Sequence, residues 1–363
     1  LSPVIIMENE LLKIVSLFDV KGDIKDVRPF GNGLINKTYL VETTEEKYML
    51  QYINSYAFKN VDSLMRNIYI VTKHLSEKGI RTLEVIKTLN NKIYIESNGA
   101  FYRLYKYIDN SICYEDLDSP ILVRKAAKAF GFLHNQLSDL DPILIAETIP
   151  DFHNTPKRYN NLMDAVKADP NSRVANCFPE LNYIMSNKSK ISMIMNGLED
   201  GSIPERIVHN DPKINNVLLD KETGKIKCVI DLDTVMPGCC LFDVGDALRS
   251  IYTGNNESAL DSSLLKVDLD VFETYVKGYC ESMGEALTQK EIDLFPYSVF
   301  TLALELAIRF LEDYIRGDVY FKTTFEGENL VRAKNQIALA KDVMANIEKM
   351  EEITRKAASN GNN

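Results

Sequence analysis

Apolar and polar positions follow strand spacing in most of the first 108 residues and helical spacing in most of the remainder. Helical patterns cover residues 8–18 and residues 61–78, the second ending at Gly79. Two-residue alternation and turn residues predict strands at 25–31, 36–43, 47–53, 83–88, 92–96 and 101–108. The N-terminal part is therefore predicted to be a compact α+β unit with one helix inserted after its third strand.

The pattern changes after Asp109. Helices are predicted at 120–137, 158–168, 180–197, 247–252, 264–283, 289–316 and 329–356. A group of strand signals at 206–235 interrupts them. We therefore expect two domains: a small antiparallel-sheet lobe over residues 1–108 and a larger, mostly helical lobe over residues 109–363.

Composition narrows the function classes without choosing one. The chain has 363 residues, a formal net charge of −10 and a pI of about 5.1, which argues against a general nucleic-acid binder because such proteins need a basic surface. The six cysteines lack zinc-ligand spacing and predict reduced, mostly buried thiols. With no signal-like or membrane-spanning run evident, a cytoplasmic protein without membrane or nucleic-acid partners is expected; the oligomeric state is left open.

The strand-rich segment between 206 and 235 carries the strongest chemical signal. An apolar run leads into His209-Asn210-Asp211; Asn216 follows five residues after Asp211, and Asp231 ends the return strand of a hairpin. Phosphoryl transfer needs a carboxylate that accepts the acceptor's hydroxyl proton and oxygen ligands for a hard cation such as Mg²⁺. The spacing predicts Asp211 as the catalytic base and Asn216 and Asp231 as magnesium ligands. Single Asp and Asn residues beside strands are often plain turn residues, but the complete set is much rarer.

These residues also carry a family resemblance. The segments His209-Asn-Asp-Pro-Lys-Ile-Asn-Asn-Val-Leu-Leu-Asp220, Ile230-Asp-Leu-Asp-Thr-Val-Met-Pro-Gly238 and Phe242-Asp-Val-Gly-Asp-Ala-Leu-Arg249 resemble the aminoglycoside phosphotransferase and choline kinase superfamily, and more narrowly the N-acetylhexosamine 1-kinases. The resemblance spans about residues 28–316. It implies a bilobal, protein-kinase-like fold, ATP and Mg²⁺ as cofactors, and a structural role for Asp243 in anchoring the catalytic loop.

The nucleotide is expected to bind the N-terminal lobe. The hairpin with Gly31, Asn32, Gly33 and Asn36 could lie over phosphates and offer backbone N–H groups, although it is equally suited to a plain turn. The segment from Arg103 to Asp109, with Tyr105 and Tyr107, is expected to be the hinge whose backbone binds adenine.

One departure from the kinase pattern concerns the third strand. Kinases place there a Lys that holds the α- and β-phosphates and pairs with a helix Glu. Here the position holds Gln51, and the following helix has no Glu in its first turns. The phosphate contact of the missing lysine could instead come from an amide hydrogen bond of Gln51 or from the charge of Arg66 or Lys37.

The acceptor should lie near Asp211. Asp233 is two residues beyond Asp231 and is a candidate ligand of a second metal or of a sugar hydroxyl. Glu305 and Arg309 share a helix face, and Asp246 and His153 are further candidates for acceptor contacts.

Three functional hypotheses follow. The first is a kinase that phosphorylates the anomeric hydroxyl of N-acetylhexosamines (GlcNAc or GalNAc), to which the segment at 230–238 is similar. The second is a kinase of another small alcohol, such as an aminoglycoside, choline or homoserine. The third is a non-catalytic nucleotide-binding module, suggested by Gln51 and opposed by the intact Asp211, Asn216 and Asp231.

Overall fold

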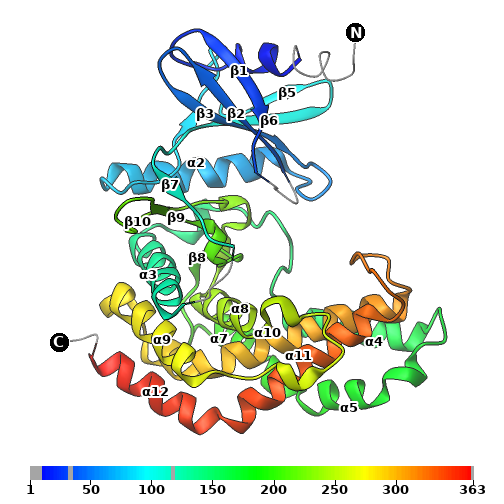
Figure 1. Cartoon of the computed structure of the whole chain (residues 1–363). Coiled ribbons are helices and arrows are strands. Elements are labelled where there is room, and N and C mark those ends of the chain that lie inside the picture. The colour runs from blue at the N-terminus through cyan, green and yellow to red at the C-terminus, as the bar shows by residue number, and fades with distance from the viewer. Residues whose placement is uncertain (1–9, 32–35, 116–118, 361–363) are drawn as a thin grey trace. The chain divides into compact units, whose positions relative to one another are not determined.

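The computed structural model describes residues 10–31, 36–115 and 119–360. The chain divides into two compact units (Figure 1). The first consists of residues 1–112, 143–149 and 218–236, and the second of residues 113–142, 150–217 and 237–363. The continuous part of the first unit extends four residues past the predicted boundary at 108, and two later segments also belong to it.

The first unit is built on an antiparallel sheet of six strands. Its order is β1 (Ile24–Pro29), β2 (Lys37–Thr43), β3 (Lys47–Ile53), β6 (Ala100–Lys106) and β4 (Val85–Ile86), with β5 (Ile95–Ser97) also paired to β6. Helix α2 (Val61–Glu77) follows β3, and the side chain of Asn60 caps it by accepting a hydrogen bond from the Ser63 N–H. The predicted α+β unit with one inserted helix is therefore confirmed, with strand ends shifted by up to three residues.

The later segments join the first unit through a second sheet and through α2. This sheet has the order β10 (Ile226–Val229), β9 (Val217–Asp220) and β7 (Ser111–Ile112). On α2, the Asn67 amide nitrogen donates to the carbonyls of Ala146 and Val235, at 2.7 and 3.2 Å. The hairpin of β9 and β10 with the turn after it is thus fixed to the N-terminal unit, although all of residues 109–363 were expected in the second domain.

The second unit is mostly helical, as predicted. Its helices are α3 (Pro120–Gln136), α4 (Thr155–Ala168), α5 (Phe178–Ser186), α6 (Lys188–Ile191), α7 (Met193–Glu199), α8 (Cys240–Thr253), α9 (Leu269–Met283), α10 (Gln289–Arg316), α11 (Glu328–Ala345) and α12 (Ile347–Asn360). Strands β8 (Arg206–Val208) and β11 (Met236–Gly238) pair with each other. Helix α10 is central: α4, α8, α11 and α12 all pack against it (Figure 1).

Several predicted helices have different bounds in the structure, and three of them differ most. The helix expected at 329–356 is broken at Asn346. This residue is the C-cap of α11, and its side-chain amide nitrogen donates a hydrogen bond to the Asp342 carbonyl at 2.9 Å. The segment 180–197 forms α5, α6 and α7 instead of one helix. Helix α8 begins seven residues before the predicted start at 247, because buried polar residues such as Asp243 interrupt its apolar periodicity.

Helix α10 is long and apolar enough to cross a membrane, with a mean hydropathy of 1.5 over its 18-residue window. Most of that window, 83%, is buried inside the protein. A core helix passes the same test of length and composition, and the burial of α10 accounts for its apolar character.

All six cysteines are free thiols, and five of them are buried. Burial raises the pKa of Cys239 and Cys240, so both thiols are protonated at neutral pH. This environment favours a packing role for the adjacent pair over redox chemistry.

Gly245 allows α8 and α10 to approach each other closely. A Cβ at this position would lie 2.6 Å from the Ser298 carbonyl oxygen, which is backbone and cannot move aside alone. We predict that Gly245→Ala lowers the free energy of unfolding by about 1–3 kcal/mol, as overpacking does in other cores. Denaturant unfolding measures the change, with Ser250→Ala on the same helix as control. Equal stability of Gly245→Ala and wild type would contradict the close approach.

Candidate active site

The loop after β8 is held by one buried carboxylate. Asn210 has a left-handed backbone conformation, with φ of 64°, which non-glycine residues adopt at a cost. The Asp243 carboxylate accepts the backbone N–H groups of His209 and Asn210, each at 2.8 Å. Asp243 and His209 are both fully buried. These bonds fix the backbone immediately before Asp211.

A histidine on α3 completes the surroundings of Asp243. His134 Nε2 lies 2.8 Å from a carboxylate oxygen of Asp243, and His134 Nδ1 lies 2.6 Å from the Tyr279 hydroxyl. Burial favours the neutral form of Asp243, but the hydrogen bond from His134 and the proximity of His209 keep its pKa below the ordinary value. The anchoring role expected for Asp243 thus has a structural basis. His134 and Tyr279 had no distinguishing signal, because each stands in an ordinary amphipathic helix.

Asp211 and Asn216 are in direct contact, as their spacing predicts. The Asn216 amide nitrogen donates to the Asp211 carbonyl at 2.9 Å and lies 3.3 Å from its Oδ2. This bonding uses the amide nitrogen and leaves Oδ1 as the atom that Asn216 can offer to a cation. The Asp211 side chain keeps 29% of its surface exposed, so a ligand can reach it.

A chain of alternating charges extends from Asp211 along the second unit. Lys213 pairs with Asp211 Oδ1 at 2.8 Å, and Arg249 pairs with Asp246 at 2.7 Å. Burial opposes the charge of Lys213, but Asp211 and Asp246 raise its pKa above the ordinary value. Asp246, a predicted acceptor residue, is therefore linked electrostatically to Asp211 through Lys213.

The predicted acceptor residues His153 and Glu305 meet in a buried cluster. His153 Nδ1 lies 2.9 Å from Glu305 Oε1, and the Thr155 hydroxyl donates to Oε2 at 2.9 Å. Burial opposes the ionisation of Glu305, but His153, Arg309 and Thr155 keep its pKa below the ordinary value. The Arg309 guanidinium lies 5.5 Å from the centre of the Phe321 ring. His153 Nε2 is buried without a hydrogen-bond partner among the described residues.

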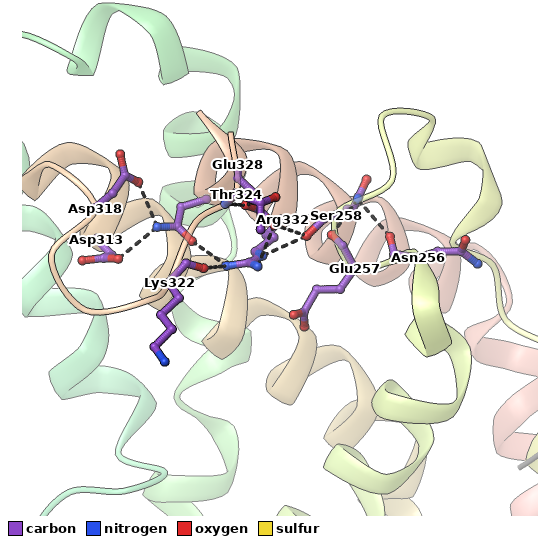
Figure 2. A network of polar contacts seen from close by, with 11 residues as sticks. Asn256, Glu257, Ser258, Asp313, Asp318, Lys322, Thr324, Glu328 and Arg332 are labelled. Carbon is purple, nitrogen blue, oxygen red and sulfur yellow. Dashed lines mark hydrogen bonds and ion pairs between the residues drawn. The ribbon is translucent and has the colours of Figure 1, made fainter. Parts of the chain in front are cut away.

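A polar network on α11 holds two loops of the second unit (Figure 2). Arg332 donates to the Ser258 hydroxyl at 3.0 Å, to the Lys322 carbonyl at 3.1 Å and to Glu328 at 2.7 Å. The Ser258 hydroxyl donates to the same carboxylate, and Thr324 donates to it through its backbone N–H and its hydroxyl. One arginine and one glutamate therefore tie the loop after α8 to the loop after α10.

Both loops carry residues close to the acceptor candidates. The loop after α8 contains Glu257, whose charge contributes to raising the pKa of Arg249. The loop after α10 contains Phe321, which lies under Arg309. Asp313 fixes this second loop further by accepting the N–H groups of residues 319–321. The network thus positions the surroundings of both arginines.

In the first unit, Asp231 follows β10 and has a left-handed backbone conformation, with φ of 57°. Two residues on, Asp233 is buried and its carboxylate is bound by side chains of the same unit. Arg103 donates to both oxygens of Asp233, to Oδ2 at 3.0 Å, and Asn36 also donates to Oδ2, at 2.6 Å. An acceptor or second metal cannot reach Asp233 unless these bonds break.

The remaining nucleotide-site candidates lie around Arg103. The Gln51 amide nitrogen donates to the Thr38 hydroxyl at 3.1 Å, and Gln51 Oε1 accepts Arg103 Nε–H at 2.9 Å. The Arg103 guanidinium lies 5.2 Å from the centre of the Tyr105 ring. The candidate substitutes for the missing lysine, Lys37 and Arg66, are exposed, whereas Arg103 is buried.

The hinge and hairpin candidates have simpler surroundings. The Tyr107 N–H donates to the Lys47 carbonyl at 3.0 Å, so this donor is used within the sheet. The Tyr107 ring packs edge-on against Phe30. Gly31 has φ of 70°, a conformation that glycine adopts without strain, while Asn32 and Gly33 lie outside the described residues.

The predicted metal ligands each offer an oxygen atom within their own unit. Within the described parts of the chain, no group of three or more His, Cys, Asp or Glu residues is arranged to hold a metal ion. Asn216 Oδ1 in the second unit and the Asp231 carboxylate in the first are hard oxygen ligands of the kind that Mg²⁺ takes. Each side chain taken by itself suits a magnesium ion chemically, and their assignment as a pair of ligands stays a prediction from the spacing.

Comparison with known proteins identifies a family. The model of the APH family, described as the phosphotransferase enzyme family, matches residues 26–275. The structure of a microcompartment-associated aminopropanol kinase is similar at 15% identity and a TM-score of 0.64, covering 94% of this chain and 98% of that one. An aminoglycoside phosphotransferase from Alicyclobacillus acidocaldarius is similar at 12% identity and a TM-score of 0.63, covering 95% and 96%. A spectinomycin phosphotransferase solved with ADP and spectinomycin gives 15% identity and 0.53, covering 96% and 98%. These similarities confirm the protein-kinase-like fold.

We predict that Asp243→Asn destabilises the loop that carries Asp211. An amide group cannot accept the three hydrogen bonds that the carboxylate accepts, so at least one buried donor loses its partner at a cost of about 3 kcal/mol. Differential scanning calorimetry should show a lower Tm, with the exposed Asp164→Asn on α4 as matched control. His134→Gln should lower the Tm less, because it leaves both backbone bonds to Asp243 intact. An unchanged Tm in Asp243→Asn would contradict the anchoring role.

Proposed function

Because the chain belongs to the phosphotransferase enzyme family, we propose that it transfers the terminal phosphoryl group of ATP to a hydroxyl group of a small molecule. The observation that supports this most directly is the anchored loop: Asp211 is accessible, its backbone is fixed through Asp243, and it contacts Asn216 five residues later. That set of contacts is what a general base beside a metal ligand requires.

The proposed chemistry assigns one task to each residue. Asp211 accepts the proton of the attacking hydroxyl, while the contact with Asn216 and the ion pair with Lys213 hold its carboxylate in place. Asn216 and Asp231 would hold a magnesium ion. Bound there, the ion would offset negative charge on the phosphate oxygens during transfer. Lys213 would also provide positive charge beside the transferred group.

For the acceptor, we propose the anomeric hydroxyl of an N-acetylhexosamine. The acceptor-side residues of the second unit are polar: Asp246 and Arg249 form an ion pair, and His153 Nε2 has no hydrogen-bond partner among the described residues. Glu305 is 2% exposed and both of its oxygens are bound, by His153 and Thr155, so it would act by orienting His153. Such a set suits a neutral, hydroxyl-rich ring. Choline recognition uses an aromatic cage, whereas these side chains are polar, and each of the two arginines, Arg249 and Arg309, is balanced by an acid, so the set carries no excess negative charge that would select a polycation.

The alternatives keep support of their own. The similar solved structures include an aminopropanol kinase and aminoglycoside phosphotransferases, so another small alcohol is the second candidate for the acceptor. A non-catalytic nucleotide-binding module was suggested by Gln51. It is disfavoured because a loop without catalytic use has no need for the strained Asn210 backbone and its buried anchor.

We predict that Asp211→Asn keeps its fold and its affinity for Mg-ADP but loses turnover by about 10²- to 10⁴-fold, because an amide cannot accept the proton. Single-turnover phosphoryl transfer measures the chemical step, and isothermal titration calorimetry measures nucleotide binding. Asp164→Asn serves as a control with the same chemical change at an exposed site. Full activity in a folded Asp211→Asn protein would refute the assignment of the base.

A second prediction concerns the acceptor. An ATP-consumption assay across GlcNAc, GalNAc, glucose, choline, homoserine and kanamycin should give the highest kcat/KM for the two N-acetylhexosamines, with a product that is phosphorylated at C1 in its NMR spectrum. Arg309→Lys should raise the KM for the sugar more than the KM for ATP. Turnover of kanamycin or choline without turnover of hexosamines would overturn the acceptor assignment and leave the phosphotransferase assignment intact.

A further inference from the structure

The first unit contains a buried ion pair at the place where the kinase lysine is missing. Arg103 lies opposite Gln51 in the pairing of β3 with β6, and only 1% of its surface is exposed. Its guanidinium donates to both oxygens of Asp233 and, through Nε, to Gln51. A positive charge therefore lies beside Gln51, but Arg103 on the neighbouring strand β6 provides it.

This ion pair joins the sheet to the turn that carries Asp231. Asp233 lies in the short helical turn directly after Asp231, whose backbone is left-handed. The same carboxylate accepts a hydrogen bond from Asn36, and Asn36 Oδ1 accepts the Asn54 N–H at 3.0 Å. One buried acid thus connects β6, the start of β2 and the end of β3 to the Asp231 turn.

The pair also sets the charge of the turn. Burial acts to lower the pKa of Arg103, but Asp233 and, to a smaller extent, Asp231 raise it above the ordinary value. The guanidinium neutralises one of the two carboxylates, because its paired donors match the two oxygens of Asp233.

We propose that the Arg103–Asp233 ion pair is a positioning device that holds Asp231 in the orientation in which it binds the nucleotide-associated magnesium. The lysine–glutamate pair of other kinases links the sheet to a helix; this pair links the sheet to the metal-binding turn. Arg103 is a positioning residue because its donors bind protein groups and its side chain is enclosed. The inference rests on the proposed function, in which Asp231 is a magnesium ligand.

A positioning role for Asp233 and a role in contacting the acceptor predict different effects of substitutions. If Asp233 positions Asp231, Asp233→Asn and Arg103→Lys should both weaken Mg-ADP binding, by about tenfold, as loss of a partner behind a metal ligand does. The effects should be strongly non-additive in the double variant, since both changes break the same bond. If Asp233 instead contacts the acceptor, Asp233→Asn should raise only the KM for the acceptor, and Arg103→Lys should leave it unchanged.

The test measures Mg-ADP binding by calorimetry in the full chain without acceptor, so the identity of the acceptor does not enter. Amide hydrogen exchange of residues 231–235 in the nucleotide-free, metal-free protein is the second readout, with Lys25→Met on β1 as control for loss of an exposed cation in the same unit. We expect faster exchange at this turn and weaker Mg-ADP binding in Arg103→Lys and, more strongly, in Arg103→Met.

Outcomes separate the inference from the proposed function. Wild-type protein that binds no Mg-ADP would overturn both. Wild-type binding, with folded Arg103→Lys and Asp233→Asn variants that match it in affinity and in exchange at 231–235, would overturn the inference alone. If Arg103→Met fails to fold, the comparison of Arg103→Lys with Asp233→Asn still decides.

Discussion

The buried carboxylate of Asp243 is the constraint on which the proposed chemistry depends. A fully buried acid is tolerated only when hydrogen bonds replace the water it has lost, and Asp243 has three such partners. Two of these partners are backbone N–H groups of the loop before Asp211. The same two hydrogen bonds therefore stabilise the buried charge of Asp243 and hold Asn210 in its left-handed conformation.

The first unit uses the same physical arrangement with a different partner. Asp233 is also buried, and a guanidinium and an amide group compensate its charge. Here too a residue with a left-handed backbone lies close by: Asp231, which the sequence predicts to be a magnesium ligand. Each unit thus pairs a strained turn with a buried acid, and the strain persists because the surrounding bonds determine the backbone.

Local features were accessible from the sequence, and distant pairings were not. The five-residue interval between Asp211 and Asn216 and the apolar run before His209 lie within one segment, so their contact could be predicted. The partners of the buried acids lie far away in the chain: Arg103 is 130 residues from Asp233, and His134 is 109 residues from Asp243. Neither basic residue differs in local pattern from its neighbours. The start of α8 was missed for a related reason: buried polar residues such as Asp243 interrupt the apolar pattern by which a helix is predicted.

The absence of the strand lysine has a physical explanation in these contacts. A lysine at Gln51 would place a second cation beside Arg103 within the sheet, and like charges at short range in a poorly solvated site repel strongly. Gln51 avoids this conflict because its carbonyl oxygen accepts the Arg103 Nε–H and its amide donates to Thr38. Glutamine at this position is therefore the complement of arginine on the next strand. The presence of Gln51 is therefore consistent with a catalytically active phosphotransferase in which the buried cation, Arg103, lies on β6 instead of β3.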